Sequence, residues 1–182
     1  MGYLIFLALM ILLMALIIPT SSVVILFIFN MLYVNLKTRV PWAKVPLSNI
    51  EMIFNNLGLP VNSLVYDLGC GDGRFLFLAE KRGFRAVGYE LAYYPYLKTL
   101  ISKYIKGSKI AIENKDFFKQ DLGAADAVFI FLTASVMNKI GLKLKNNLKA
   151  ETTVVSYGFA IPGWTISNIL ETKPSKTYIY IK

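Results

Sequence analysis

The 182-residue sequence contains no histidine and a single cysteine, Cys70. Without histidine the chain has no imidazole to act as a general base, to complete a Ser–His catalytic triad or to form the common zinc sites. One cysteine cannot form a disulfide within the chain. The chemistry that remains uses carboxylates, hydroxyls, lysines and the backbone, and we expect no metal site.

Charged side chains are also missing from the first part of the chain, where none occurs from Tyr3 to Val34. This run consists mainly of Leu, Ile, Val, Met and Phe, and it exceeds the about 20 apolar residues that a helix needs to cross a bilayer. Pro19 and the hydroxyl residues after it favour a kink, which membrane helices tolerate. We therefore expect residues 1–36 to form an anchor with one kinked or tilted span that ends in an interfacial stretch.

Three other interpretations of this apolar run compete with a single span. A cleaved signal peptide would need a basic start, a shorter apolar stretch and a small-residue cleavage site, and the run has none of these. A hairpin of two helices is possible, but each half is short for a bilayer. A buried core helix would need more partner surface than the rest of the chain supplies.

Positive charge predominates in the whole sequence, with 20 Lys and Arg against 11 Asp and Glu and a net charge of +9. Lys37, Arg39 and Lys44 follow the apolar run, so the positive-inside rule places the rest of the chain in the cytoplasm of a prokaryote. Trp42 among them is expected to lie at the membrane interface or to pack on the following domain. Nucleic acid is the rival partner for positive charge, but the other lysines are scattered as on solvated helix faces. We expect a lipid bilayer as partner and no nucleic acid.

A glycine-rich turn follows the first strand expected after this basic segment. The sequence DLGCGDG occupies residues 67–73, after an apolar run and before a helical pattern. Gly69, Gly71 and Gly73 let the backbone turn tightly and approach a ligand. The dinucleotide fingerprint G-x-G-x-x-G has a different spacing, because here the third glycine comes one residue early and Asp67 stands two residues before the first.

Short apolar strands alternate with helical patterns along the rest of the chain. Ser48 and Glu51 form a capping-box pattern, which predicts a helix that begins at Ser48. This order predicts an α/β fold with a Rossmann-like doubly wound sheet that a C-terminal antiparallel hairpin closes. The remaining expected strands lie at residues 85–89, 109–113, 127–132 and 152–156, and the hairpin strands at residues 165–170 and 177–181.

Ligands of such sheets bind at the carboxyl ends of the strands. Five residues are expected to meet there, namely Gly69, Glu90, Asp116, Thr133 and Tyr157.

DLGCGDG resembles motif I of the seven-β-strand (class I) S-adenosylmethionine-dependent methyltransferases. The resemblance implies S-adenosyl-L-methionine as cofactor, with its methionine half in the glycine turn and its ribose hydroxyls on Glu90. An acid after the third strand would meet the adenine amino group, and the next backbone N–H a ring nitrogen. Asp116 and Phe117 fit these places, with Asp121 as a rival for the acid, while Glu90 has the alternative of capping the helix after it. The cofactor-binding residues so implied are Asp67, Gly69, Gly71, Gly73, Glu90, Leu91, Asp116 and Phe117.

The layout is also similar to one branch of these enzymes, the membrane-anchored lysine methyltransferases that modify the c-ring protein of ATP synthase and the adenine nucleotide translocase. The similarity lies in the apolar N-terminal run, a Pro-aromatic-x-x-Val-Pro stretch at residues 41–46, VYDLGCGDGRF from residue 65, AVGYEL from residue 86 and VVSYGFAIPGW from residue 154. It implies a protein-lysine N-methyltransferase that acts on a membrane protein, with a pre-methyltransferase linker at residues 37–47 and a methyltransferase domain at residues 48–182.

Methyl transfer from a sulfonium to lysine needs a neutral amine and no side-chain base, because burial lowers the lysine pKa and water can remove the proton. Alignment and desolvation then supply most of the catalysis. Aromatic faces can hold a methylated ammonium by cation–π attraction, although hydrophobic core is the alternative for each aromatic side chain. Two further functions stay open, a methyltransferase for a quinone or lipid and a non-enzymatic cofactor-binding scaffold. The candidate pocket residues are Thr133, Ser135, Tyr157, Phe159 and Trp164.

Overall fold

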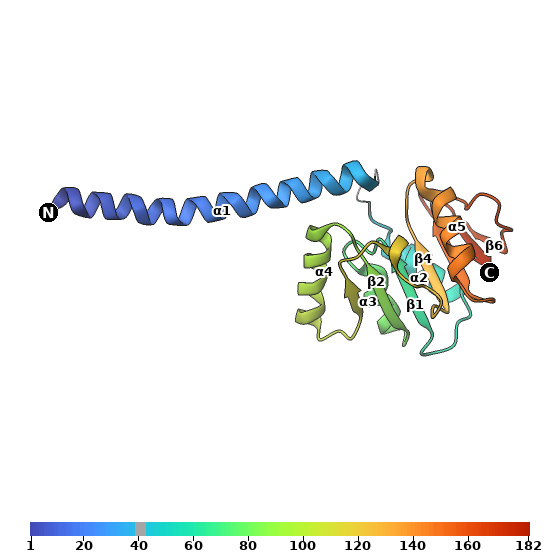
Figure 1. Ribbon diagram of the computed structural model, residues 1–182. Coiled ribbons are helices and arrows are strands. Elements are labelled where there is room, and N and C mark those ends of the chain that lie inside the picture. Colours follow the sequence, from blue (N-terminus) through green and yellow to red (C-terminus); the bar gives the residue numbers. More distant parts are fainter. Residues whose placement is uncertain (39–42) are drawn as a thin grey trace. The chain divides into compact units, whose positions relative to one another are not determined.

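The computed structural model describes residues 1–38 and 43–182, which belong to two compact units, residues 1–38 and 39–182. The predicted interfacial residue Trp42 lies outside the described residues. The first unit is a helix, and the second contains all the strands (Figure 1).

The first unit is a single helix, α1 (Gly2–Thr38), which continues through Pro19. Because Pro19 has no N–H, the carbonyl one turn earlier lacks its usual donor. The hydroxyls of Thr20, Ser21 and Ser22 donate to carbonyls of the preceding turn at 2.8–2.9 Å. These three hydroxyl groups therefore have hydrogen-bond partners within the helix. By length and composition the stretch Ile5–Asn30 can cross a bilayer. The prediction of one helix is confirmed, and the alternative of a two-helix hairpin is wrong.

The second unit is built on a seven-stranded sheet with the order β3-β2-β1-β4-β5-β7-β6. The first five strands run parallel, and β7 pairs antiparallel with both β5 and β6. This arrangement confirms the predicted doubly wound α/β sheet with its closing antiparallel hairpin. The strands are β1 (Leu64–Leu68), β2 (Arg85–Tyr89), β3 (Ala111–Glu113), β4 (Ala127–Ile130), β5 (Thr153–Tyr157), β6 (Asn168–Leu170) and β7 (Thr177–Ile181).

Helices cover both faces of this sheet because successive residues of a strand point to opposite sides. Val65 and Phe129 pack in one hydrophobic cluster with residues of α2 (Leu47–Asn56) and α3 (Arg74–Lys81). Tyr66 and Val128, their neighbours along the strands, pack in the other cluster with α5 (Met137–Asn147). α4 (Tyr93–Lys106) lies on the α3 side, where its Tyr96 contacts the first cluster (Figure 1). The sheet therefore has a core on each side.

The predicted capping box of α2 does not form. The helix begins at Leu47 with Pro46 as its N-cap, and no side chain caps it. Two backbone N–H groups, those of Asn49 and Ile50, donate to the Pro46 carbonyl at 3.1 and 3.2 Å. The prediction was wrong because the start is set one residue earlier by this proline and by the burial of Asn49, whose side chain bonds elsewhere in the fold.

Candidate active site

The glycine turn at residues 69–73 joins the carboxyl end of β1 to α3, between β2 on one side and β4 on the other. Gly69, Gly71 and Gly73 have φ values of 88°, 55° and 72°, in the left-handed region that favours glycine. A Cβ on Gly73 would lie 2.4 Å from Cγ2 of Thr99 in α4. A Cβ on Gly69 would lie 3.4 Å from Cδ2 of Leu132, so the turn also reaches the end of β4.

Most N–H groups of this turn already have protein partners. Those of Gly69 and Cys70 donate to the Tyr89 carbonyl at 2.8 and 3.1 Å, and that of Gly71 donates to Oε2 of Glu90 at 2.9 Å. Thr99 donates from its hydroxyl to the Gly71 carbonyl at 2.8 Å. These hydrogen bonds fix the turn to β2 and α4 without a ligand. A ligand can approach the turn backbone closely, but few N–H groups remain to bind a phosphate.

Asp67 is the last but one residue of β1, and its carboxyl group is almost fully buried. Burial raises the pKa of Asp67 well above its usual range, and the negative charges of Glu90 and Asp72 raise it further. Among the described residues, no cation or hydrogen-bond donor contributes a lowering of this pKa. A buried carboxyl in such surroundings favours a ligand that brings its own positive charge.

Glu90 follows the last residue of β2 and is also buried. Its Oε2 accepts from Gly71 and its Oε1 accepts from the N–H of Ala92 at 2.8 Å, immediately before α4. Burial raises the pKa of Glu90, although these backbone hydrogen bonds oppose the rise. Each carboxylate oxygen keeps acceptor capacity for a hydroxyl. The two interpretations of Glu90 are therefore compatible, because one carboxylate can support the start of α4 and still accept from a ribose.

The end of β3 is tied to the end of β2 by Asn114, a residue that no sequence motif singles out. Its amide donates to the carbonyls of Glu90 at 2.7 Å and Leu91 at 3.1 Å. Asp116 then caps a short 3₁₀ turn, η1 (Phe117–Lys119), because its Oδ1 accepts from the Phe118 N–H at 3.0 Å. A carboxylate has a second oxygen that can accept from an amino group such as that of adenine.

The rival acid, Asp121, lies further along the same loop. It is exposed and accepts from the N–H of Gly123 at 2.9 Å.

The candidate pocket residues after β4 and β5 do not all lie together. Thr133 and Ser135 lie in the turn after β4, with their hydroxyl oxygens 3.0 Å apart. Tyr157 is buried in the α2-side cluster, where Asn49 of α2 donates to its hydroxyl at 3.1 Å. Trp164 packs in the α5-side cluster, so the sheet separates it from Tyr157.

Trp164 and Phe159 differ in how accessible their rings are to a ligand. Trp164 stacks edge-on against Tyr180, with ring centroids 5.9 Å apart, and belongs to the packing of β7 and α5. Phe159 is 42% exposed in the loop after β5. The Ser156 hydroxyl donates to the Phe159 carbonyl at 2.6 Å and fixes that loop. Of the predicted set, Ser135 and Phe159 are exposed, Thr133 and Trp164 are partly buried, and Tyr157 is buried.

A polar clamp, formed by Lys44, Val45, Asp72 and Arg74, joins the glycine turn to the segment before α2. The Arg74 guanidinium donates to both carboxylate oxygens of Asp72 at 2.9 and 2.7 Å and to the Val45 carbonyl at 2.8 Å. Lys44 lies 3.9 Å from the same carboxylate. Burial opposes ionisation of Asp72, but the hydrogen bonds and charge of Arg74 outweigh it and hold the pKa of that carboxyl below its usual value. No sequence pattern indicates this contact across 29 residues.

We predict that Asp67→Asn stabilises the ligand-free protein at neutral pH and weakens cofactor binding. The folded-state pKa of Asp67 is raised, so the stability linked to this group is present below its unfolded pKa and is lost as pH rises through the folded pKa. The gain in Tm should therefore shrink toward acid pH. Loss of one charge-assisted contact, about 1.5–3 kcal/mol, should weaken S-adenosylhomocysteine binding about ten- to a hundredfold.

The control for this variant is Glu171→Gln, which changes an exposed acid in the C-terminal hairpin and should alter neither quantity. Thermal unfolding against pH and calorimetric titration provide the measurements. If the Asp67→Asn variant has a lower Tm than the wild type at neutral pH, or the same affinity for S-adenosylhomocysteine, the Asp67 carboxyl does not bind a cationic group of the ligand.

We call the second unit, residues 39–182, the catalytic unit. We predict that Arg74→Gln destabilises it at neutral pH by about 1–3 kcal/mol, because the change leaves Asp72 half-buried without its cation and frees the Val45 carbonyl. Arg74→Lys should recover only part of this loss, since a single ammonium cannot reproduce the three hydrogen bonds. Urea unfolding measures the change, and Lys81→Gln on the same helix serves as control. Equal stability of Arg74→Gln and the wild type would contradict the clamp.

The sequence matches the ANTKMT methyltransferase domain family over residues 67–168. It is 30% identical over 151 residues to a protein-lysine N-methyltransferase of Saccharolobus islandicus, a match that covers 79% of this chain and 94% of the relative. It is 32% identical over 136 residues to the adenine nucleotide translocase lysine N-methyltransferase of Mus musculus, covering 72% of this chain and 58% of that protein. The chain thus spans nearly all of the archaeal relative and little more than half of the mouse one.

Solved structures share the fold. The crystal structure of an RNA methyltransferase from Salinibacter ruber in complex with S-adenosyl-L-homocysteine superposes with a TM-score of 0.72 at 25% identity, over 76% of this chain and 93% of that one. The ribosomal protein L11 methylase of Lactobacillus delbrueckii subsp. bulgaricus gives a TM-score of 0.64 at 15% identity, over 78% and 80% of the two chains. The buried acids and the glycine turn fit a cofactor with a positively charged amino-acid end and a ribose. The chain therefore belongs to the ANTKMT methyltransferase domain family and is an S-adenosylmethionine-dependent methyltransferase.

Proposed function

We propose that this protein is a membrane-anchored protein-lysine N-methyltransferase that acts on a membrane protein. The observation that carries the proposal is the similarity to lysine methyltransferases over most of the chain. The mouse relative is named for a membrane protein, the adenine nucleotide translocase. The candidate span in α1 supports a substrate in or at the same bilayer.

The residues proposed to hold the cofactor lie at the ends of β1, β2 and β3. Asp67 would receive the cationic amino group, Glu90 the ribose hydroxyls, and Asp116 with the Phe117 N–H the adenine edge. The glycines would let the methionine part lie close to the turn, and Leu91 would line the adjoining loop. When bound, S-adenosylmethionine supplies an electrophilic methyl group for direct, in-line transfer to a neutral amine.

The chain's own contribution to the transfer is alignment and exclusion of water. Thr133 and Ser135 place two hydroxyl groups at the end of β4, next to the glycine turn. They can accept from a lysine ammonium and orient it as it loses a proton to water. Phe159 offers an aromatic face to the ammonium, which cation–π attraction favours. A lysine drawn into this partly apolar place has a lowered pKa, so histidine is not required.

We propose that α1 crosses the bilayer once and that the catalytic unit lies in the cytoplasm. The apolar stretch is flanked on its carboxyl side by Lys37, Arg39 and Lys44. Positive residues concentrate on the cytoplasmic side of a span. S-adenosylmethionine is made and used in that compartment, which agrees with this orientation.

The function predicts that labelled S-adenosylmethionine transfers its methyl group to a protein of the host membranes. Label should remain in a protein band after lipid extraction, and hydrolysis of that band should yield methyllysine. Glu90→Gln should reduce labelling about tenfold or more by weakening cofactor binding. Thr133→Val with Ser135→Ala should reduce labelling while S-adenosylhomocysteine affinity stays at the wild-type value.

The same experiment separates the other functions, with Glu171→Gln as the exposed control. Label that moves entirely into the organic phase would identify a quinone or lipid substrate instead. Cofactor binding without any transfer would indicate a scaffold.

The orientation is tested with a membrane-impermeant thiol reagent on intact prokaryotic cells, because the native Cys70 is buried. A cysteine introduced as Glu171→Cys should react only after the cells are opened. One introduced as Tyr3→Cys, before the span, should react in intact cells. Reaction of the Glu171→Cys variant in intact cells would refute a cytoplasmic catalytic unit.

A further inference from the structure

Helix α4 has an inverted distribution of apolar residues. A surface helix normally turns its large apolar side chains toward the core, but the residues that α4 buries are Pro95 and Thr99. Four large apolar residues in its second half point outward instead. They are Leu100, Ile101, Tyr104 and Ile105, which are 37, 52, 89 and 77% exposed, and we call them the outer face of α4. The i, i+3, i+4 spacing of three of them makes one continuous stripe.

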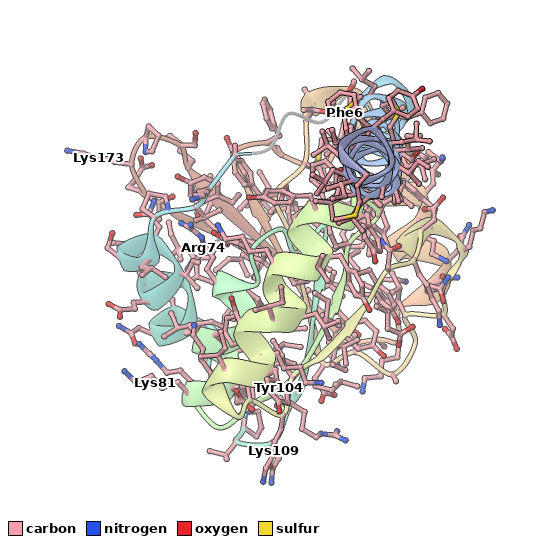
Figure 2. All side chains as sticks on the ribbon, turned by 90° about the vertical axis from the view of Figure 1, so that its left-hand side faces the viewer. Phe6, Arg74, Lys81, Tyr104, Lys109 and Lys173 are labelled. Carbon is pink, nitrogen blue, oxygen red and sulfur yellow. The ribbon has the colours of Figure 1, made fainter. Side chains whose placement is uncertain are left out.

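The inner side of α4 explains why these residues face outward. Thr99 lies against the glycine turn, where its hydroxyl bonds the Gly71 carbonyl and its methyl group occupies the space above Gly73. A large side chain in that place would displace the cofactor turn. The helix therefore presents a small residue to the sheet and leaves its larger apolar residues on the surface, where Figure 2 shows Tyr104.

The charge on α4 is of one sign. Its 14 residues include Lys98, Lys103 and Lys106 and contain neither Asp nor Glu. Lys109 follows just after the helix. The Lys106 ammonium lies 4.0 Å from the centre of the Phe77 ring of α3, so this lysine turns to the inner side of α4, whereas Lys98 and Lys103 lie beside the outer face. Apolar and tyrosine side chains flanked by lysines are typical of helices that lie in the interface of an anionic bilayer.

The proposed anchor keeps the catalytic unit close to a bilayer. The candidate span ends at Asn30, and residues 31–38 continue α1 before the described part of the catalytic unit begins at Ala43. Eight helical residues and the greatest length that four more residues can add together reach roughly 25 Å at most. Since that is comparable to the size of a small domain, the tether holds the catalytic unit at high effective concentration near the lipid surface.

We propose that the outer face of α4 inserts into the headgroup region of an anionic bilayer and fixes the catalytic unit on the membrane. This proposal rests on the membrane anchor of the proposed function. α4 starts beside Glu90 and contacts the cofactor turn through Thr99, so lipid contact at this helix restrains the cofactor edge of the sheet relative to the membrane. A target lysine near the membrane surface then meets the site in a restricted orientation.

The test uses the full chain in lipid nanodiscs that contain phosphatidylglycerol, with a spin label on one introduced cysteine at a time. Ile101→Cys and Ile105→Cys report on the outer face, and Leu142→Cys is the matched control, an exposed apolar position on α5 across the sheet. Ile17→Cys reports on α1. The chain without an introduced cysteine gives the background from buried Cys70, and S-adenosylhomocysteine binding confirms that each variant is folded.

The measurement is access of each label to oxygen, which concentrates in lipid, and to a water-soluble nickel chelate. Labels at residues 101 and 105 should show an oxygen-to-nickel ratio several-fold above that at residue 142, and Lys98→Gln with Lys103→Gln should lower it. Ratios equal to that at residue 142 would overturn the proposal. Shielding from both reagents would also overturn it, because a protein partner or second copy would then cover the face. Nickel access at residue 17 would show that the anchor itself has failed.

Discussion

Two carboxyl groups buried at the ends of adjacent parallel strands constrain the rest of the catalytic unit. The pairing of β1 with β2 fixes the positions of Asp67 and Glu90 relative to each other. Burial disfavours the ionisation of both, and the charge of Glu90 disfavours that of Asp67 further. Within residues 1–38 and 43–182, backbone hydrogen bonds favour the ionised form of Glu90 but not that of Asp67. A site of this kind repels a pyrophosphate and attracts a cation, which agrees with a cofactor that carries a sulfonium and an ammonium.

Hydrogen bonds and close packing around the two carboxyl groups hold them in place. Glu90 bonds the glycine turn on one side and the start of α4 on the other. Thr99 must be small because Gly73 lies beneath it, and this leaves the apolar residues of α4 on the surface. Arg74 connects the glycine turn to the segment before α2, because its guanidinium donates to the Val45 carbonyl. The cofactor turn therefore contacts both α4, which we propose to lie at the bilayer, and the segment that precedes α2.

Local patterns predicted the features that depend on neighbours in sequence. The glycine turn, the alternation of strands and helices and the closing hairpin all have short-range signatures, and the carboxyl ends of parallel strands necessarily share an edge. Contacts between distant residues could not be predicted in this way. The capping box predicted for Ser48 and Glu51 does not form, because α2 begins at Leu47 after Pro46, and the amide of Asn49 instead reaches Tyr157 across the fold. The side of the sheet that Tyr157 and Trp164 take depends on their packing partners, and the sequence does not specify those partners.

The central claim is that a cation completes the buried acidic pair, and proton release on cofactor binding tests it most directly. S-adenosylhomocysteine should be titrated calorimetrically at several pH values from acid to neutral, in buffers of different ionisation enthalpy. The raised pKa of Asp67 in the free protein falls when an ammonium group lies beside it, so binding should release protons and the measured heat should vary with the buffer. Heat that is independent of the buffer, or proton uptake, would contradict the account.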